Sequence, residues 1–188
     1  AALGRIARAI AAYQPVTVFC RASERDIAEE ECGSHNITYV ETELDDIWMR
    51  DIGANFVVDD DGALGAVDFN FNGWGGKQQH RHDAKLAARV AKLAGAQYQR
   101  SELVGEGGGI EVDGHGTAIM TESCWVNDNR NPGWSRAQVE AELKDCLGLR
   151  KIIWLPGIRG QDITDAHVDF YARFVRPGVV VALSLIHI

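Results

Sequence analysis

The sequence is poor in the features that mark membrane-bound and nucleic-acid-binding proteins. No apolar run among its 188 residues approaches the ~20 that a membrane-spanning helix needs, so a membrane is not expected as a partner. Lys and Arg number 19 against 27 Asp and Glu, which gives a formal net charge of −8. Because phosphate binding needs clustered Lys and Arg, no nucleic acid is expected as a partner either. The same acidic balance fits a cationic ligand.

Cysteine is sparse, and its spacing matches no metal motif. The chain has four cysteines and no CxxC pair: Cys20, Cys32, Cys124 and Cys146. In a domain large enough to fold without cross-links, sparse cysteines predict buried thiols rather than disulfides. An initiator methionine and a recognisable signal peptide are also lacking, and a segment upstream of residue 1 is therefore expected.

The chain does contain an ordinary globular composition and a recurring structural pattern. With 46% hydrophobic and 24% charged residues, it fits a single domain over 1–188. The pattern is a unit of strand, strand, helix and strand, marked by hairpin turns at Asp61-Gly62, Asp113-Gly114 and Pro177-Gly178. Turns about 50 to 65 residues apart are typical of a propeller or a similar array. The alternative is an α+β sandwich with a mixed sheet.

Apolar periodicity and turn signals place the individual elements. Strands are expected at 16–20, 37–40, 55–58, 63–69, near 98, and at 110–112, 117–120, 151–155, 170–175 and 179–183. Helices are expected over 3–10, from 23, over 83–93, and from 135 to about 148.

Reactive polar side chains precede each of the three hairpins. Asp51 lies ten residues before the first turn, and Glu106 lies seven before the second. His167 and Asp169 lie ten and eight residues before the third. Equivalent loops of a circular array lie on the same side of its axis. The three segments are therefore predicted to converge on one pocket.

Three carboxylates in such a pocket suit one class of ligand. The donors of a planar guanidinium match carboxylates in bidentate pairs, so Asp51, Glu106 and Asp169 favour a guanidinium compound. The glycine run 107–109 lets backbone come close to a ligand.

Aromatic and imidazole side chains complete the predicted pocket. Trp48 and Trp74 are available to stack on a delocalised cation. His167 is the natural proton-transfer group, because its ordinary pKa lies near neutrality. Structural alternatives stay open: Asp51 pairing with Arg50, Trp74 in the core, and purely structural roles for Glu106, His167 and Asp169. The acidic run 59–61 is interpreted as a solvated hairpin tip.

Five motifs in this order resemble one family. They are WMRD (48–51), FNFNGWGGK (69–77), EGGGIEVDGHGT (106–117), NDNRNP (127–132) and DITDAHVDFYARFVRPG (162–178). Together they resemble agmatine deiminases and bacterial-type peptidylarginine deiminases of the guanidine-modifying superfamily. The resemblance implies an α+β fold, a five-unit α/β propeller with roughly three units here. Residues 1–188 would then be a single partial catalytic domain, in which 184–188 do not resemble the family.

The resemblance also implies a reaction and its residues. Agmatine and water would give N-carbamoylputrescine and ammonia, a step of putrescine and polyamine biosynthesis. Asp51 and Asp169 would clamp the guanidinium, Glu106 would support it, His167 would transfer protons, and Trp48 would line the pocket. No metal or organic cofactor is implied. The expected enzyme is a cytoplasmic homo-oligomer that acts on a small cationic guanidinium substrate.

The family's cysteine nucleophile, which lies in a glycine-rich segment near the C-terminus, has no counterpart here. Cys124 is the nearest rival by location, and the 188 residues alone are expected to be inactive. Alternatives are a peptidyl-arginine deiminase, a non-catalytic guanidinium-binding module and a metal-dependent hydrolase. The candidate metal ligands for the last are Asp162, Asp165, His167 and Asp169, with His80 and His82.

Overall fold

The computed structural model describes residues 2–183, which fall into two compact units, the first ending at Ile47 and the second beginning at Trp48. In the first unit, β1 (Val16–Cys20) and β2 (Ile37–Glu41) pair in parallel. The helices of this unit are α1 (Ala2–Ala11), η1 (Ala22–Glu24) and α2 (Arg25–Cys32). Gly4 lets α1 pass close to α2, because a Cβ there would collide with the Glu31 carbonyl group.

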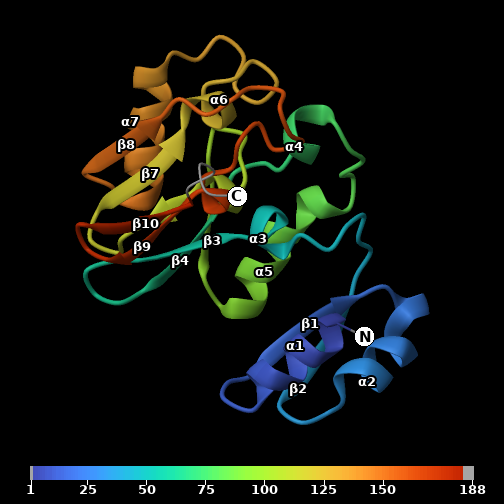
Figure 1. Ribbon diagram of the computed structural model, residues 1–188. Coiled ribbons are helices and arrows are strands. Elements are labelled where there is room, and N and C mark those ends of the chain that lie inside the picture. The colour runs from blue at the N-terminus through green and yellow to red at the C-terminus, as the bar shows by residue number, and fades with distance from the viewer. Residues whose placement is uncertain (1, 184–188) are drawn as a thin grey trace. The chain divides into compact units, whose positions relative to one another are not determined.

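The second unit, from Trp48 onward, repeats one arrangement of strands (Figure 1). In the first round, β3 (Asn55–Val58) pairs antiparallel with β4 (Leu64–Asp68), which pairs in parallel with β5 (Gln97–Arg100). In the second round, β6 (Glu111–Val112) pairs antiparallel with β7 (Thr117–Thr121), which pairs in parallel with β8 (Lys151–Leu155). The predicted unit of strand, strand, helix and strand is therefore found twice.

The helices of the second unit connect these strands. Between β4 and β5 lies α5 (Leu86–Ala94), and between β7 and β8 lies α7 (Arg136–Leu147). The short helical elements are α3 (Met49–Ile52), α4 (Gly73–Gly76), η2 (Asp83–Lys85), η3 (Gly107–Gly109), α6 (Glu122–Trp125) and η4 (Val168–Phe170).

A third hairpin follows, with β9 (Ala172–Arg176) antiparallel to β10 (Val179–Ala182). The strand predicted from Phe170 begins two residues later, because Tyr171 N still donates to Val168 O and so closes η4 (2.9 Å). The expectation for 184–188 lies outside the described residues. Residues 2–183 form four separate sheets, and these do not close into a barrel. The mixed helix-and-strand fold is confirmed.

Local signals read from the sequence explain the ends of α7. The Ser135 side chain accepts from Gln138 N and the Gln138 side chain accepts from Ser135 N, which together form a capping box at the predicted start of the helix. Gly148 ends the helix in the left-handed region, at a φ of 63°. The main core lies between α7 and the two three-stranded sheets, and the edge of Phe69 packs on Trp125 at 5.3 Å.

Candidate functional site

The loops before the three hairpins meet around His167. Asp51 comes from α3, Glu106 lies directly before η3, and His167 lies directly before η4. Glu106 is completely buried and His167 is 2% exposed. Equivalent loops therefore converge, as the spacing of the motifs predicted.

Two carboxylates flank the His167 ring. Nε2 lies 3.2 Å from Glu106 Oε2, and Nδ1 lies 3.6 Å from Asp51 Oδ1. The His167 backbone N–H donates to Thr164 Oγ1 at 3.0 Å, which fixes the start of the turn. An imidazole held between two carboxylates can accept or donate a proton within a fixed geometry.

Asp51 is oriented by two uncharged donors. The Trp74 indole N–H donates to Oδ2 and the Gly108 backbone N–H donates to Oδ1, each at 3.0 Å. Burial raises the pKa of the Asp51 carboxyl above its usual value, although His167 and these two donors act to lower it. Two hydrogen bonds thus orient the Asp51 carboxylate, while its burial disfavours the ionised form.

Trp74 is placed differently from the expected stacking surface. It is 3% exposed, packs edge-on against Phe71 at 4.9 Å, and has left-handed backbone with a φ of 56°. This burial makes Trp74 a support for Asp51 rather than an open face for a ligand. Trp48, by contrast, is 55% exposed and free to line a pocket.

Asp169 is half-buried in η4, two residues after His167. Among the described residues, no hydrogen bond or ion pair joins it to Asp51, Glu106 or His167. The structure therefore brings together three of the four predicted catalytic side chains, and the fourth, Asp169, is near only His167 in the sequence.

The glycine run 107–109 lets Asp51, His167 and Trp125 pack closely against the backbone of η3. A Cβ on Gly108 would lie 2.6 Å from Asp51 Oδ1, and one on Gly109 would lie 2.9 Å from Trp125 Nε1. Real Cβ atoms do not tolerate such approaches. The run was expected to let backbone approach a ligand, and it lets backbone approach the site's own side chains.

Sequence reasoning missed Arg130, although the motif NDNRNP contains it. Its side chain is completely buried, and its Nε donates to both Glu106 oxygens at 2.9 and 3.0 Å. Burial alone would raise the pKa of Glu106, but the His167 hydrogen bond and the Arg130 charge outweigh it and hold the pKa below its usual value. Glu106 is therefore ionised and accepts hydrogen bonds only.

Two acids of the metal-dependent alternative, Asp162 and Asp165, already serve other contacts. Asp165 pairs with Lys77 at 2.7 Å and with Arg130 at 2.8 Å. Asp162 accepts from the Thr164 backbone N–H at 2.7 Å within its own turn. These contacts use the two carboxylates as internal counter-ions and turn caps.

A compact set of possible metal ligands is formed instead by Glu106, Cys124 and His167, whose ligand atoms lie within 4.8 Å of one another. Arg130 already neutralises Glu106, and burial raises the pKa of the Cys124 thiol well above its usual value, with Glu106 adding to the rise. A neutral thiol beside an arginine-paired carboxylate is a poor cation site.

The four cysteines are buried free thiols. Cys124 donates towards Glu106 Oε2 at 3.7 Å. Since a thiol attacks only as the thiolate, its raised pKa makes Cys124 a poor nucleophile. The thiol of Cys146 is likewise held neutral, because burial raises its pKa to about 11.

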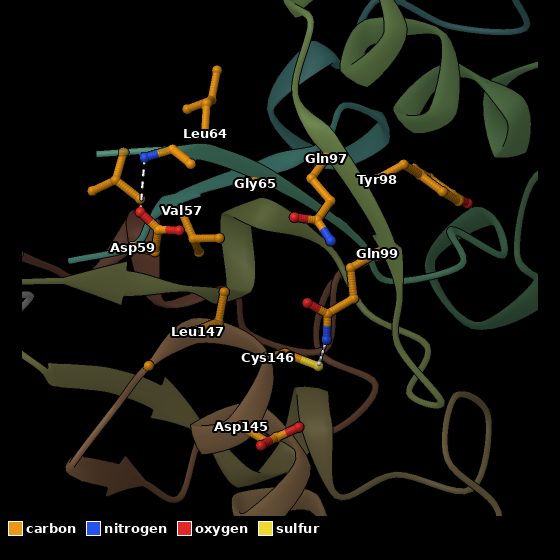
Figure 2. A pocket seen from close by; sticks show the side chains of 13 residues that line it. Val57, Asp59, Leu64, Gly65, Gln97, Tyr98, Gln99, Asp145, Cys146 and Leu147 are labelled. Carbon is orange, nitrogen blue, oxygen red and sulfur yellow. Dashed lines mark hydrogen bonds between the residues drawn. The ribbon is translucent and has the colours of Figure 1, made fainter. Parts of the chain in front are cut away.

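A separate cavity of about 420 Å³ lies between the β3–β4 hairpin, β5 and the end of α7 (Figure 2). None of its lining residues is a predicted site residue. The Asp59 carboxylate at its rim accepts from the Asp61 and Ala63 backbone N–H groups, so it serves the hairpin turn. The Gln99 amide in the cavity donates to Cys146 Sγ at 3.8 Å. This cavity is distinct from the His167 cluster.

Comparisons with known proteins agree on one family. Residues 1–185 match the family model of Porphyromonas-type peptidyl-arginine deiminases. A protein of Streptomyces avermitilis is 50% identical over 185 residues, which cover 94% of this chain and 53% of that protein. The agmatine deiminase of Pseudomonas aeruginosa (strain LESB58) is 42% identical over 186 residues, 96% of this chain and 50% of that protein.

Solved structures give the same result. The agmatine deiminase of Enterococcus faecalis superposes with a TM-score of 0.91 at 31% identity, over 98% of this chain and 52% of that one. The chain spans about half the length of the relatives it matches. None of the helices within residues 2–183 has the length and apolar character that crossing a membrane requires.

Proposed function

Because the chain belongs to the Porphyromonas-type peptidyl-arginine deiminase family, we propose that the protein encoded by its complete gene is an agmatine deiminase. The reaction converts agmatine and water to N-carbamoylputrescine and ammonia. Named agmatine deiminases among its relatives and structural neighbours support this substrate. The proposal concerns the whole protein, since the chain spans about half the length of those relatives.

The observation that carries the proposal is the His167 ring between two carboxylates, the completely buried Glu106 at 3.2 Å and the partly buried Asp51 at 3.6 Å. Asp51 presents an oriented carboxylate for guanidinium N–H groups, and Asp169 supplies the second arm of the clamp. Trp48, exposed at the start of α3, lines the pocket.

The chemistry follows the covalent route of cysteine hydrolases. A cysteine thiolate adds to the guanidinium carbon, His167 donates a proton to the departing nitrogen, and ammonia leaves. Water then adds to the thiouronium carbon as His167 removes a proton, and the thiolate is released with the carbamoyl product. None of the four cysteines present occupies the family's nucleophile context, so residues 1–188 alone bind guanidinium without hydrolysing it.

The proposal includes the family architecture. The chain, apart from its last residues 184–188, belongs to one partial catalytic domain with roughly three units of a five-unit α/β propeller. The enzyme acts in the cytoplasm in polyamine biosynthesis, as a homo-oligomer that needs no cofactor.

The test is the release of ammonia and N-carbamoylputrescine from agmatine by the purified protein, with Asp51→Asn beside it. The variant should lose about 10²-fold or more in kcat/KM, because it removes a charge aimed at the substrate cation. Asp60→Asn, at the exposed hairpin tip, is the matched control and should retain full activity. Absence of turnover in the unaltered protein would refute the agmatine assignment.

A second candidate, peptidyl-arginine deimination, is favoured by the description of the family itself. Citrulline formation in an arginine-containing peptide, measured beside agmatine turnover, separates the two. A peptide turned over faster than agmatine would replace the first proposal. Activity abolished by a chelator and restored by a divalent metal would favour the metal-dependent alternative.

A further inference from the structure

The turn that carries His167 is held in an unusual backbone conformation. Asp165 and Ala166, directly before it, have φ values of 60° and 71°. Residues other than glycine rarely adopt this left-handed region, because it strains their backbone. The surrounding structure must therefore supply the contacts that keep this turn in place.

Three successive carbonyl groups of the turn are held by side chains from one segment. Thr121 Oγ1 donates to Ala166 O at 2.7 Å, and Ser123 Oγ donates to Asp165 O at 2.7 Å. The third donor is Arg130, whose Nη2 donates to Thr164 O at 3.1 Å. All three bonds are buried, where a lost partner is costly.

The Arg130 guanidinium also contacts the turn through the Asp165 side chain. Arg130 Nη1 donates to Asp165 Oδ2 at 2.8 Å, inside a site that also receives Lys77 Nζ at 2.7 Å. The other Asp165 oxygen accepts from Gly160 N at 2.8 Å. The Asp165 side chain is thus fixed on both oxygens, and with it the strained backbone.

The opposite edge of the guanidinium holds Glu106, through Nε and both carboxylate oxygens. One rigid, planar group therefore ties the carboxylate partner of His167 to the turn that carries His167. Since ionised Glu106 can only accept, His167 Nε2 must be the donor in their 3.2 Å contact. Nδ1 is left facing Asp51.

We propose that Arg130 is a positioning residue that fixes His167 with Nε2–H on Glu106 and with Nδ1 as the atom that exchanges protons near Asp51. The role in turnover rests on the proposed deiminase function. The role in fixing the ring does not, because it depends only on contacts within the protein.

The decisive variant is Arg130→Lys in the protein encoded by the complete gene. Lysine keeps the charge that Glu106 and Asp165 need, but it cannot replace the planar fork that reaches Glu106, Asp165 and Thr164 O together. For agmatine, kcat should fall about tenfold to a hundredfold with KM changed less than about threefold. Arg136→Lys, in an exposed ion pair with Glu122, is the control and should leave both constants unchanged.

A second readout needs no substrate. In ¹⁵N NMR spectra of the imidazole ring, His167 should carry the Nε2 proton in the unaltered protein and show mixed ring forms in Arg130→Lys. An unchanged ring and an unchanged kcat in this variant would overturn the proposal. An unaltered protein that is inactive on agmatine refutes the proposed function alone, and the NMR comparison still decides the role of Arg130.

Asp165→Asn tests the turn separately, since it removes the charge that receives Arg130 Nη1 and leaves the Glu106 pair intact. A fall of about tenfold in kcat with the Nε2 proton retained is expected. Full activity in this variant would show that the Arg130–Asp165 contact is not needed, and it would overturn the claim that Arg130 positions His167 through the turn.

Discussion

The two carboxylates beside His167 have contrasting surroundings. Glu106 is completely buried and forms an ion pair with Arg130. Burial would raise the pKa of Glu106, but the His167 hydrogen bond and the Arg130 charge hold it below its usual value. Asp51 is less deeply buried and receives its hydrogen bonds from the uncharged Trp74 indole and Gly108 amide, and burial raises its pKa. A permanent internal counter-ion thus distinguishes a structural carboxylate from one left available for a cationic substrate.

The largest expected effect comes from removing the counter-ion. Arg130→Met leaves Glu106 and part of the Asp165 charge buried without compensation, which should cost about 3–5 kcal/mol in the free energy of unfolding. Urea unfolding of the variant measures the loss. The matched control, Arg136→Met, breaks an exposed ion pair and should cost no more than about 1 kcal/mol. Equal losses in the two variants would contradict the distinction.

A smaller effect concerns pH. The pKa of Glu106 is lower in the folded state than its ordinary value of 4.5, so its contribution to stability is fully present above that pH. The contribution is lost as the pH falls below 4.5 towards the folded pKa. Glu106→Gln should therefore be less stable than the unaltered protein at pH 7, by about 1–3 kcal/mol, and the gap should narrow on acidification.

Urea unfolding between pH 7 and pH 3 is the measurement for Glu106→Gln. The control is Glu102→Gln, an exposed acid on the same loop, whose curve should run parallel to that of the unaltered protein. If the difference in the free energy of unfolding between Glu106→Gln and the unaltered protein stayed constant with pH, a lowered pKa of Glu106 would be refuted.

The smallest expected effect concerns Trp74, an uncharged hydrogen-bond donor to Asp51. Trp74→Phe removes a donor that lowers the pKa of Asp51, so this pKa should rise further. On acidification, KM for agmatine should then begin to increase at a higher pH than in the unaltered protein. Trp154→Phe removes an equivalent indole bond to Glu140, away from the site, and should leave the pH profile unchanged. A profile shifted equally in both variants would contradict the role of Trp74.

Much of the architecture could be predicted because its signals are local. Turn pairs such as Asp113-Gly114 lie where the β6–β7 hairpin reverses, and Ser135 with Gln138 begins α7 as a capping pair does. The convergence of Asp51, Glu106 and His167 followed from their equivalent positions before the hairpins.

The supporting side chains could not be predicted in the same way. Arg130 and Asp165 come from irregular loops, where no periodicity tells which way a side chain points. Asp165 contacts Arg130 from a backbone position with a positive φ, and the sequence alone does not predict that an aspartate adopts this conformation. Trp74 likewise directs its indole to Asp51 from a left-handed position, whereas the sequence suggested a stacking surface or a core residue.

The hydrogen bonds that hold the turn before His167 also limit where the chain tolerates insertions. Thr121, Ser123 and Arg130 lie within ten consecutive residues and reach three consecutive carbonyl groups. One residue inserted between Ser123 and Arg130 would displace the guanidinium from its partners without altering any side chain. At the exposed hairpin tip around Asp60, by contrast, the Asp59 carboxylate accepts hydrogen bonds from within the same turn. Length variation and epitope tags should therefore be accepted at that tip and rejected between 123 and 130.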